Sequence, residues 1–419
     1  MLKILKQTKS TNYISFEEIH KKWKRHYRNK NELNLKWENC ISIKKGTFKN
    51  VNTLAYLAFT DPQCHPSEIF SLNSGCFNGL SLLKSIFLGN CGIEIIYEDV
   101  FSNLTNLESL YLSENNLKII NSKLFSGLIN LKQLYLSDCS IEIIEAHSFD
   151  GLNNLLYLDL SLNQIEKFHL NLFGDLKNLL KINLHRFEVK SKESINSFQC
   201  LTSLENIISS IKDMNFWVNF LSNKTQENIK KITLFDNFYG TELIDEDFDG
   251  DNNQAYFISL NFTYLINLQE LILDNNYISI IKNGYFDHLV NLKSISFFAC
   301  CIEVIENDAF DNLKNLESLD LQENFLDGSN FSILFKNLQN LKYLDLSSNE
   351  FKSMNCDFIS RLVNLEKFIL SSCQINSLNL EAFVNLTGLK TLDLRGNNLN
   401  NLTRDDFSFL PNLNKLFLS

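Results

Sequence analysis

Residues 104–175 consist of three consecutive copies of a 24-residue unit, and this period constrains the fold more than any other feature of the sequence. The first copy reads LTNLESLYLSENNLKIINSKLFSG and the second reads LINLKQLYLSDCSIEIIEAHSFDG. Each copy has leucine-type residues at its first, fourth, seventh and ninth positions, Asn or an equivalent at the twelfth, and Phe at the twenty-second. Self-similarity at a period of about 20–50 residues indicates a solenoid of stacked coils.

The residues of one unit predict how each coil is built. In Leu110–Leu112 the leucines alternate with Tyr111, which is the period of a short strand with one buried face. Asn115 follows where the chain must leave the strand, and its amide can bond the backbone of the turn and of the neighbouring coil. No coil can cover its own apolar face, so we expect stability to come from stacking on the neighbours.

The same pattern extends over most of the chain, with a Phe three residues before most repeat starts. We place sixteen starts, the last repeat being cut off after ten residues, at Tyr27, Val51, Leu80, Leu104, Leu128, Leu152, Leu176, Leu201, Gln226, Leu265, Leu289, Leu313, Leu338, Leu362, Leu386 and Leu410. The Phe residues are Phe48, Phe77, Phe101, Phe125, Phe149, Phe173, Phe198, Phe286, Phe310, Phe335, Phe383 and Phe407, and Ile359 replaces one of them. A Phe at a fixed place in consecutive coils predicts a continuous internal column.

With its Asn at the twelfth position and its Phe near the end, the unit resembles the typical subtype of leucine-rich repeat. That subtype is known from Toll and Toll-like receptor ectodomains, Slit and chaoptin, and the resemblance covers about residues 27–419. It implies an α/β-type leucine-rich-repeat solenoid, or horseshoe, of about 15–16 repeats. It also implies a parallel β-sheet on the concave face, a mostly non-helical convex face and a role in extracellular recognition.

Period and composition divide the chain into four segments. Residues 1–26 are predicted to form a basic N-terminal cap with a short helix, since residues 1–50 carry 13 Lys and Arg against 4 Asp and Glu in a chain of net charge −10. A nucleic-acid contact, a membrane contact or a nuclear-import signal are alternatives for this segment. Residues 27–184 are regular repeats, 185–264 are irregular repeats with insertions, and 265–419 are regular repeats that end in a truncated one.

The sequence leaves two compartments open. The basic start is interrupted by Lys3 and Lys6 and lacks the apolar core of a signal peptide, and no window is long and apolar enough for a transmembrane helix. Membrane attachment is therefore not encoded in this chain. We expect an extracellular or cell-surface protein if a signal sequence lies upstream, and a cytoplasmic one otherwise.

Twelfth positions are predicted to form a structural ladder in which Asn and small, buried Cys residues alternate. Its members are Cys91, Asn115, Cys139, Asn163, Cys300, Asn324, Asn349, Cys373 and Asn397. Cys64 and Cys76 bracket an insertion and are close enough in sequence for a disulfide, which the sequence leaves open. Their spacing with His65 does not match a zinc site.

Nothing in the sequence predicts catalysis or a cofactor. The seven His residues are scattered, and no phosphate loop, HExxH or GxSxG motif is present. Six glycosylation sequons occur, a number that the Asn, Ser and Thr content gives by chance, at Asn103, Asn223, Asn261, Asn330, Asn385 and Asn401.

Residues flanking the inner leucines of each strand should face the concave side. Adjacent strands lie about 4.8 Å apart, so Phe87, Tyr111 and Tyr135 should form a contiguous stripe. With Tyr157 and Asp159 they make up the predicted partner-binding surface, because Tyr is enriched at interfaces. The C-terminal half presents Asp320, Asp345 and Asp393 instead.

These features predict a non-catalytic protein-recognition module, either a Toll-receptor-like ectodomain or a secreted binder, acting in innate immunity or adhesion. The expected partner is a protein, with a glycan or a microbial ligand as alternatives, and a nucleic acid is not expected. An intracellular adaptor or substrate-binding subunit, for instance of a ubiquitin ligase, is the alternative function. The oligomeric state is not predicted.

Overall fold

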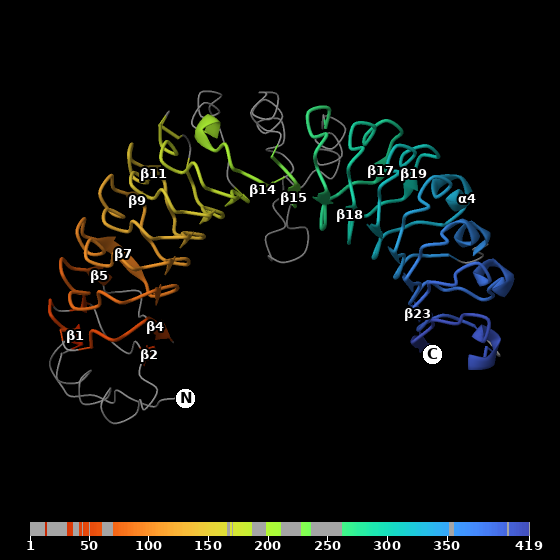
Figure 1. The fold of residues 1–419 in the computed structure, drawn as a ribbon, viewed down its shortest axis with the longest axis horizontal. Coiled ribbons are helices and arrows are strands. Elements are labelled where there is room, and N and C mark those ends of the chain that lie inside the picture. Colours follow the sequence, from red (N-terminus) through yellow and green to blue (C-terminus); the bar gives the residue numbers. More distant parts are fainter. Residues whose placement is uncertain are drawn as a thin grey trace, which may run out of the picture. The chain divides into compact units, whose positions relative to one another are not determined.

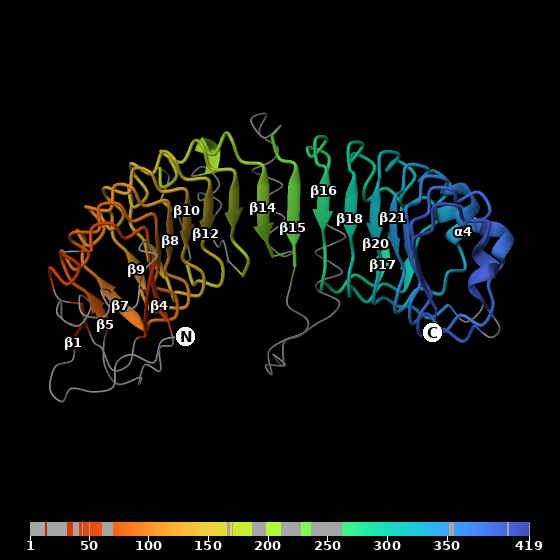
Figure 2. The same cartoon turned by 60° about the horizontal axis from the view of Figure 1, so that its bottom comes forward.

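The computed structural model describes residues 13–14, 32–36, 42–43, 45–49, 51–60, 70–165, 168–169, 171–186, 198–210, 228–235, 262–351, 356–399 and 402–418. The chain divides into two compact units, Met1–Ile207 and Ile208–Ser419. In each unit the chain winds in successive coils, and every coil contributes one short strand to a parallel sheet (Figures 1 and 2).

Strands of this main sheet follow one another in chain order. In the N-terminal unit they are β2 (Glu32–Lys36), β4 (Tyr56–Thr60), β6 (Ser85–Phe87), β8 (Ser109–Tyr111), β10 (Gln133–Tyr135), β12 (Tyr157–Asp159), β13 (Lys181–Asn183) and β14 (Asn206–Ser209), which contains the division between the units. In the C-terminal unit they are β15 (Lys231–Leu234), β16 (Glu270–Ile272), β18 (Ser294–Ser296), β20 (Ser318–Asp320), β21 (Tyr343–Asp345), β22 (Lys367–Ile369), β23 (Thr391–Asp393) and β24 (Lys415–Phe417).

The register agrees with the repeat period. Each of these strands begins five residues after one of the predicted repeat starts, as β8 does after Leu104. Equivalent residues pair across strands, so that Leu110 lies opposite Leu134 and Leu134 opposite Leu158. All three leucines are fully buried. The predicted parallel-sheet solenoid is therefore confirmed.

The side of the coils away from the main sheet holds short strands and little helix. Its strands form a sheet of β1 (Tyr13–Ile14), β3 (Ser42–Ile43), β5 (Phe70–Leu72) and β7 (Ile93–Ile96), the pair β9 (Ile119–Ile120) and β11 (Ile143–Ile144), and the pair β17 (Ile280–Ile281) and β19 (Val304–Ile305). The described helical elements are α4 (Phe331–Leu334), the 3-10 helices η3 (Cys356–Arg361), η4 (Leu380–Phe383) and η5 (Arg404–Phe407), and a single 3-10 turn at residues 198–200. Among the described residues the outer side is thus mostly non-helical, as predicted.

Buried Phe rings form the predicted column inside each unit. Ring centroids of Phe77 and Phe101 lie 6.0 Å apart, and those of Phe149 and Phe173 are also 6.0 Å apart. Phe262 belongs to the column as well, since its ring lies 6.0 Å from that of Phe286 and is 2% exposed. Each buried ring contributes roughly 1.5–3 kcal/mol, so the column is a major part of the core.

A ladder of buried Asn side chains fastens neighbouring coils. The Asn115 amide nitrogen donates to the carbonyl oxygens of Leu88 (2.9 Å) and Leu112 (2.6 Å), and its oxygen accepts from the backbone N–H groups of Cys91 (3.1 Å) and Ile93 (2.8 Å). Equivalent bonds are made by Asn163, Asn324 and Asn397. One side chain thus satisfies buried backbone groups of two coils at once.

In coils with Cys at the twelfth position, the thiol and the backbone together satisfy the buried groups that Asn satisfies elsewhere. The Cys139 thiol donates to the Leu112 carbonyl oxygen (3.1 Å), and the backbone carbonyl of Cys139 accepts from the N–H of Leu117 (2.9 Å). Cys300 and Cys373 repeat the thiol bond to the preceding coil. Burial raises the pKa of the Cys139 and Cys373 thiols to about 12, so both stay protonated and unreactive. Cys can therefore replace Asn in the ladder, because a backbone carbonyl accepts the hydrogen bond that the Asn side-chain oxygen would accept.

Some sequence predictions fall on residues that the structure leaves undescribed. The helix expected within 1–26, residue Cys64 and most of 185–264 are among them, so the four-segment division stays a prediction. Cys76 is a buried thiol that forms no disulfide. Within 1–26 the described residues form strand β1, which pairs with β3.

Leu134→Asp should unfold several coils of the N-terminal unit together, because it places an unpaired carboxylate between coils whose stability is shared with their neighbours. We expect a loss of at least about 3 kcal/mol in the free energy of unfolding, measured by urea denaturation. Leu156→Asp is the matched control, since Leu156 is 37% exposed, and it should change stability by less than about 0.5 kcal/mol. Equal effects of the two substitutions would contradict the register.

Candidate recognition surface

Parallel pairing of β6, β8 and β10 brings aromatic residues of successive coils together on the open face of the sheet. Phe87 lies opposite Tyr111, and Tyr111 lies opposite Tyr135. The ring centroids of Phe87 and Tyr111 are 4.0 Å apart at an interplanar angle of 11°, and those of Tyr111 and Tyr135 are 4.3 Å apart at 10°. The adjacency that the repeat period predicts is present as face-to-face stacking.

Two further tyrosines extend this row, which we call the aromatic stripe and define as Tyr56, Phe87, Tyr111, Tyr135 and Tyr157. The Tyr135 and Tyr157 rings meet edge to face at 5.0 Å. Tyr56, which the sequence analysis did not include, packs its ring 4.8 Å from Phe87. It stands at the sixth position of its repeat, as Tyr157 does, and this shared position is the signal that could have identified it.

Stacking decides which parts of the rings remain accessible. All five side chains are half-buried, because the face of each inner ring lies against its neighbour. Ring edges and hydroxyl groups are therefore the parts presented to solvent. Burial raises the pKa of Tyr135 to about 12, with smaller contributions from Tyr111 and Asp159, so its hydroxyl is a neutral donor at physiological pH.

The stripe ends at Asp159, and here the structure differs from the prediction. Asp159 was expected to contact a partner, but it is only 8% exposed. Its carboxylate accepts hydrogen bonds from the Tyr157 hydroxyl (2.9 Å) and from the Ser161 N–H (3.0 Å) and hydroxyl (2.7 Å). Asp159 thus orients Tyr157, and the Lys181 ammonium covers the other side of that ring 5.1 Å from its centroid.

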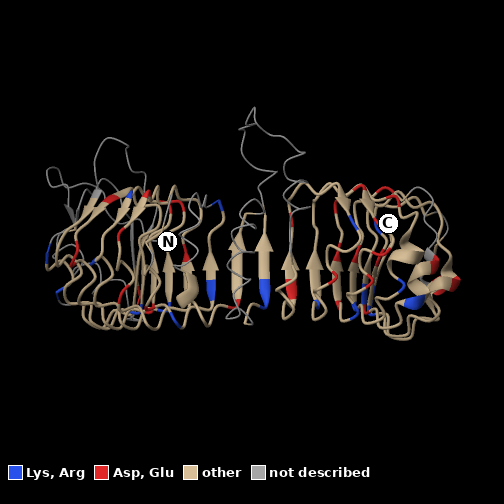
Figure 3. Cartoon of the chain, turned by 90° about the horizontal axis from the view of Figure 1, so that it is seen from above, with Lys and Arg blue, Asp and Glu red and all other residues tan. Residues whose placement is uncertain are grey.

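Small polar residues flank the stripe. Ser109 donates to Gln133 (3.0 Å), and the hydroxyl of Ser137 donates to that of Ser113 (2.9 Å). Strands of the N-terminal unit carry few charged residues, as the mostly tan ribbons there show (Figure 3). The surface around the stripe is therefore nearly neutral and rich in Tyr and Ser.

In the C-terminal unit the sequence predicts three carboxylates on the open face of the sheet, Asp320, Asp345 and Asp393, and two of the three are buried. Asp345 is 3% exposed and accepts from Tyr343 and Ser347, which repeats the arrangement around Asp159. Asp393 is 6% exposed and pairs with the Arg395 guanidinium at 2.6 Å. Both carboxylates hold the fold in place rather than facing solvent.

Asp320 is different, because it is only half-buried and makes one hydrogen bond, from the Gln322 N–H at 3.0 Å. Burial, together with the carboxylates of Asp345 and Asp274, raises the pKa of Asp320 to about 6. This side chain changes charge just below neutral pH.

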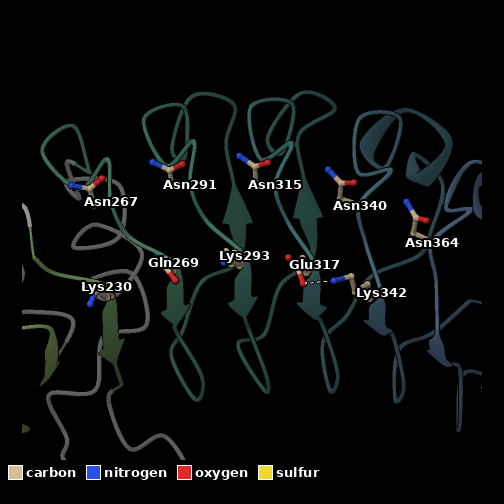
Figure 4. A pocket seen from close by; sticks show the side chains of 10 residues that line it. All are labelled: Lys230, Asn267, Gln269, Asn291, Lys293, Asn315, Glu317, Asn340, Lys342 and Asn364. Atoms are coloured by element: carbon tan, nitrogen blue, oxygen red, sulfur yellow. Dashed lines mark hydrogen bonds and ion pairs between the residues drawn. The ribbon is translucent and has the colours of Figure 1, made fainter.

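One edge of the coils carries a second set of Asn side chains that the sequence analysis missed. Asn106, Asn130, Asn291 and Asn315, at the third position of their repeats, each donate to a carbonyl of the preceding coil at 2.8–2.9 Å. In the C-terminal unit this Asn row borders a groove of about 820 Å³ (Figure 4). The recurrence of Asn at the third position was visible in the sequence and is the signal that could have revealed this row.

Beside the Asn row, Lys and Glu alternate along the same edge. Glu317 and Lys342, which line the groove, pair at 2.7 Å (Figure 4). In the N-terminal unit Glu108 lies between Lys84 (3.2 Å) and Lys132 (2.7 Å). These exposed pairs are worth little individually. The groove is lined by Lys230, Lys293 and Lys342 against Glu317, so its lining carries more positive than negative charge.

Within the described part of the chain, no three His, Cys, Asp or Glu side chains cluster closely enough to hold a metal ion. The described helices are all too short or too polar to cross a bilayer.

The leucine rich repeat family profile matches residues 65–117, 83–141, 106–165, 129–187, 266–326, 332–375 and 363–419. The chain belongs to the leucine-rich repeat family. No curated relative matches it.

Solved structures of this family share the fold at low sequence identity. The TLR13–ssRNA13 complex aligns at a TM-score of 0.63 and 23% identity, covering 93% of this chain and 60% of that one. The Drosophila Toll–Spatzle complex aligns at 0.63 and 19% identity, covering 93% of this chain and 55% of the other. This leucine-rich-repeat chain therefore spans little more than half the length of these neighbours.

Asp320→Asn should remove a pH dependence of stability between about pH 4 and 6. The folded protein binds the Asp320 proton more tightly than the unfolded chain does, so unfolding releases a proton in this window. The contribution of Asp320 to stability is therefore present below about pH 4 and is lost as the pH rises through 6. Urea denaturation of both proteins at pH 4, 5, 6 and 7 measures it.

We expect the stability of wild type relative to Asp320→Asn to fall as the pH rises through this window. A difference that stays constant from pH 4 to 7 would contradict the assignment. Carboxylates that do not interact with Asp320 act equally in both proteins and cancel in the comparison, whereas Asp345 and Asp274 lose a like-charged neighbour in the variant.

Proposed function

We propose that this chain is a non-catalytic recognition module of the leucine-rich repeat family that binds a protein partner through the aromatic stripe. We further propose that it acts outside the cell or at its surface, in recognition or adhesion. The observation that carries the proposal is the contiguous stack of half-buried rings on the open face of the N-terminal sheet.

The stacking geometry favours a polypeptide over a glycan or a nucleic acid. Sugars and nucleobases gain most by lying flat on an aromatic face, but the faces of the inner rings are already occupied by each other. Ring edges and neutral hydroxyls remain, and these suit the apolar side chains and backbone carbonyls of a protein. The stripe is thus built to contact a protein surface.

The low charge around the stripe also favours a protein over a nucleic acid as the ligand. A nucleic-acid site needs several Lys or Arg residues to neutralise phosphates, whereas among the described residues one ammonium, that of Lys181, lies against a ring of the stripe. The structural neighbours were solved with different kinds of ligand, RNA for TLR13 and Spatzle for Toll, so the fold alone does not select one. The neutral surface of this chain favours the protein.

Composition around the stripe also matches what protein interfaces use. Tyr supplies rigid contact area with a polar tip, and neighbouring Ser residues supply adaptable hydrogen bonds, a pairing that antibody paratopes share. Because Asp159 and the neighbouring rings hold the side chains in place, little conformational entropy is lost on binding. A few such anchors carry most of the energy of an interface.

Replacing Tyr111 and Tyr135 together by Ala should weaken binding of the purified partner at least about tenfold, since each aromatic anchor typically contributes over 1 kcal/mol. The partner is first captured by cross-linking on the native chain, and the dissociation constant is then measured by calorimetry. Tyr97→Ala is the matched control, because Tyr97 is 51% exposed and lies away from the stripe, and it should leave binding unchanged.

If binding survives the double substitution but is lost when residues 245–253 are deleted, the central insertion is the recognition element and the proposed role of the stripe is wrong. That insertion lies outside the described residues. A partner found only in the cytosol would favour the intracellular adaptor instead.

Salt dependence separates the two classes of ligand. Between 50 and 200 mM salt, affinity for a protein bound at this neutral stripe should change by no more than about twofold. A nucleic acid held by many phosphate contacts would lose roughly 10³-fold or more over the same range. A steep loss would therefore overturn the choice of a protein partner.

A further inference from the structure

Three glycosylation sequons lie in the described residues, and the fold treats their Asn side chains differently. They are Asn103-Leu104-Thr105, Asn330-Phe331-Ser332 and Asn385-Leu386-Thr387. As sequence motifs the three are equivalent. What distinguishes them is the state of the amide nitrogen, the atom to which an N-linked glycan is joined.

Asn330 has both amide hydrogens committed to the fold. The side chain is half-buried, and its nitrogen donates to the backbone carbonyl of Ile305 (2.6 Å) and to the side-chain oxygen of Asn307 (3.2 Å). The first of these bonds ties the start of α4 to strand β19 of the preceding coil. A glycan replaces one hydrogen on this nitrogen and needs open space around it, so this site conflicts with the folded coil.

Asn385 is in the opposite situation. It follows η4 in an exposed turn between the buried residues Phe383 and Leu386, and its own side chain is exposed. Among the described residues its amide has no hydrogen-bond partner. A glycan here displaces nothing.

Asn103 stands at the same position of its repeat as Asn385, immediately before the leucine that opens the next coil. Its side chain is exposed, and its nitrogen donates once, to the exposed Asn78 oxygen at 2.9 Å. One hydrogen therefore remains available for substitution. Among the described sequons, each unit thus offers one accessible acceptor at the same point of a coil.

We propose that Asn103 and Asn385 are N-glycosylation sites of the folded protein and that Asn330 is not. The donor is an oligosaccharide linked to a polyprenyl pyrophosphate. The amide nitrogen forms a bond to the anomeric carbon, the bond from that carbon to the pyrophosphate oxygen breaks, and the amide loses one proton as the lipid pyrophosphate leaves. No oxidant or reductant is needed.

The positions of these glycans leave the aromatic stripe accessible within its unit. Asn103 lies at the last position of its repeat, six residues before β8 begins, whereas the stripe occupies the strands themselves. The modification is therefore compatible with the proposed binding surface, although it does not depend on it.

Site occupancy in secreted protein tests the proposal. The full chain is expressed behind a cleavable secretion leader in glycosylating cells, and the secreted monomer is analysed by glycopeptide mass spectrometry before and after glycosidase treatment. We expect glycan on Asn103 and Asn385 and an unmodified Asn330. Glycan on Asn330 in folded, secreted monomer, or its absence from Asn385, would overturn the assignment.

Matched substitutions give a second, independent readout. Asn385→Gln should remove one glycan without lowering Tm, whereas Asn330→Gln should remove none and lower Tm by roughly 2–4 °C, as loss of one hydrogen bond does in a unit of this size. Ser332→Ala, which abolishes the sequon but keeps Asn330, should change neither. The Tm values are measured on unglycosylated protein. They therefore test whether the fold needs the Asn330 amide and not the Asn385 amide, even if secretion fails. A Tm loss in Asn385→Gln equal to that in Asn330→Gln would contradict it.

Discussion

The buried Asn amide at the twelfth position of many repeats is the interaction on which the rest of the fold depends. A single side chain such as Asn163 satisfies backbone donors and acceptors of two neighbouring coils, groups that have no water to bond to. This demand sets the distance and the rotation between coils. Once these are set, leucines face leucines, Phe rings stack in a column and each strand meets its equivalent in the next coil. Where Cys replaces Asn, the backbone supplies the missing acceptor and the geometry is kept.

That same geometry turns a spacing in the sequence into contact between rings. Residues 24 positions apart, such as Phe87 and Tyr111, come within 4.0 Å because their coils are superimposed. The resulting surface is held from within, by ring faces and by the Asp159 carboxylate. In the C-terminal unit three of the equivalent positions hold carboxylates, and one of them, Asp320, is half-buried near the carboxylates of Asp345 and Asp274, which help to raise its pKa. The same scaffold therefore presents a neutral aromatic surface in one unit and a carboxyl group that titrates near pH 6 in the other.

The features that could be predicted from the sequence are those that recur in every repeat. The repeat starts predict where each described main-sheet strand begins, although the leucine alternation placed β8 at Leu110–Leu112, one residue later than it lies. The recurring Phe predicts the core column. Phe262 and the Asn row at the third position also lie at fixed positions of the repeat, so the sequence could have predicted them, but they were overlooked. The burial of Asp159 and Asp345 could not be predicted in this way. It arises because Tyr157 and Tyr343 fold over carboxylates two residues away, a side-chain choice that the strand period does not specify. Local side-chain contacts, rather than the coil geometry, decide which concave residues remain available.

The coil that runs from Leu313 to Asn337 is one residue longer than the 24-residue unit, and helix α4 lies on its outer side. The strand of this coil, β20, and the strand of the next coil, β21, still pair residue for residue. The extra residue is thus absorbed on the outside without disturbing the sheet. The geometry of the coils therefore constrains the two sides differently: the outer side can change in length without moving the sheet, while the inner side can change in identity but not in spacing. New binding specificities can then arise by substitution on an unaltered frame.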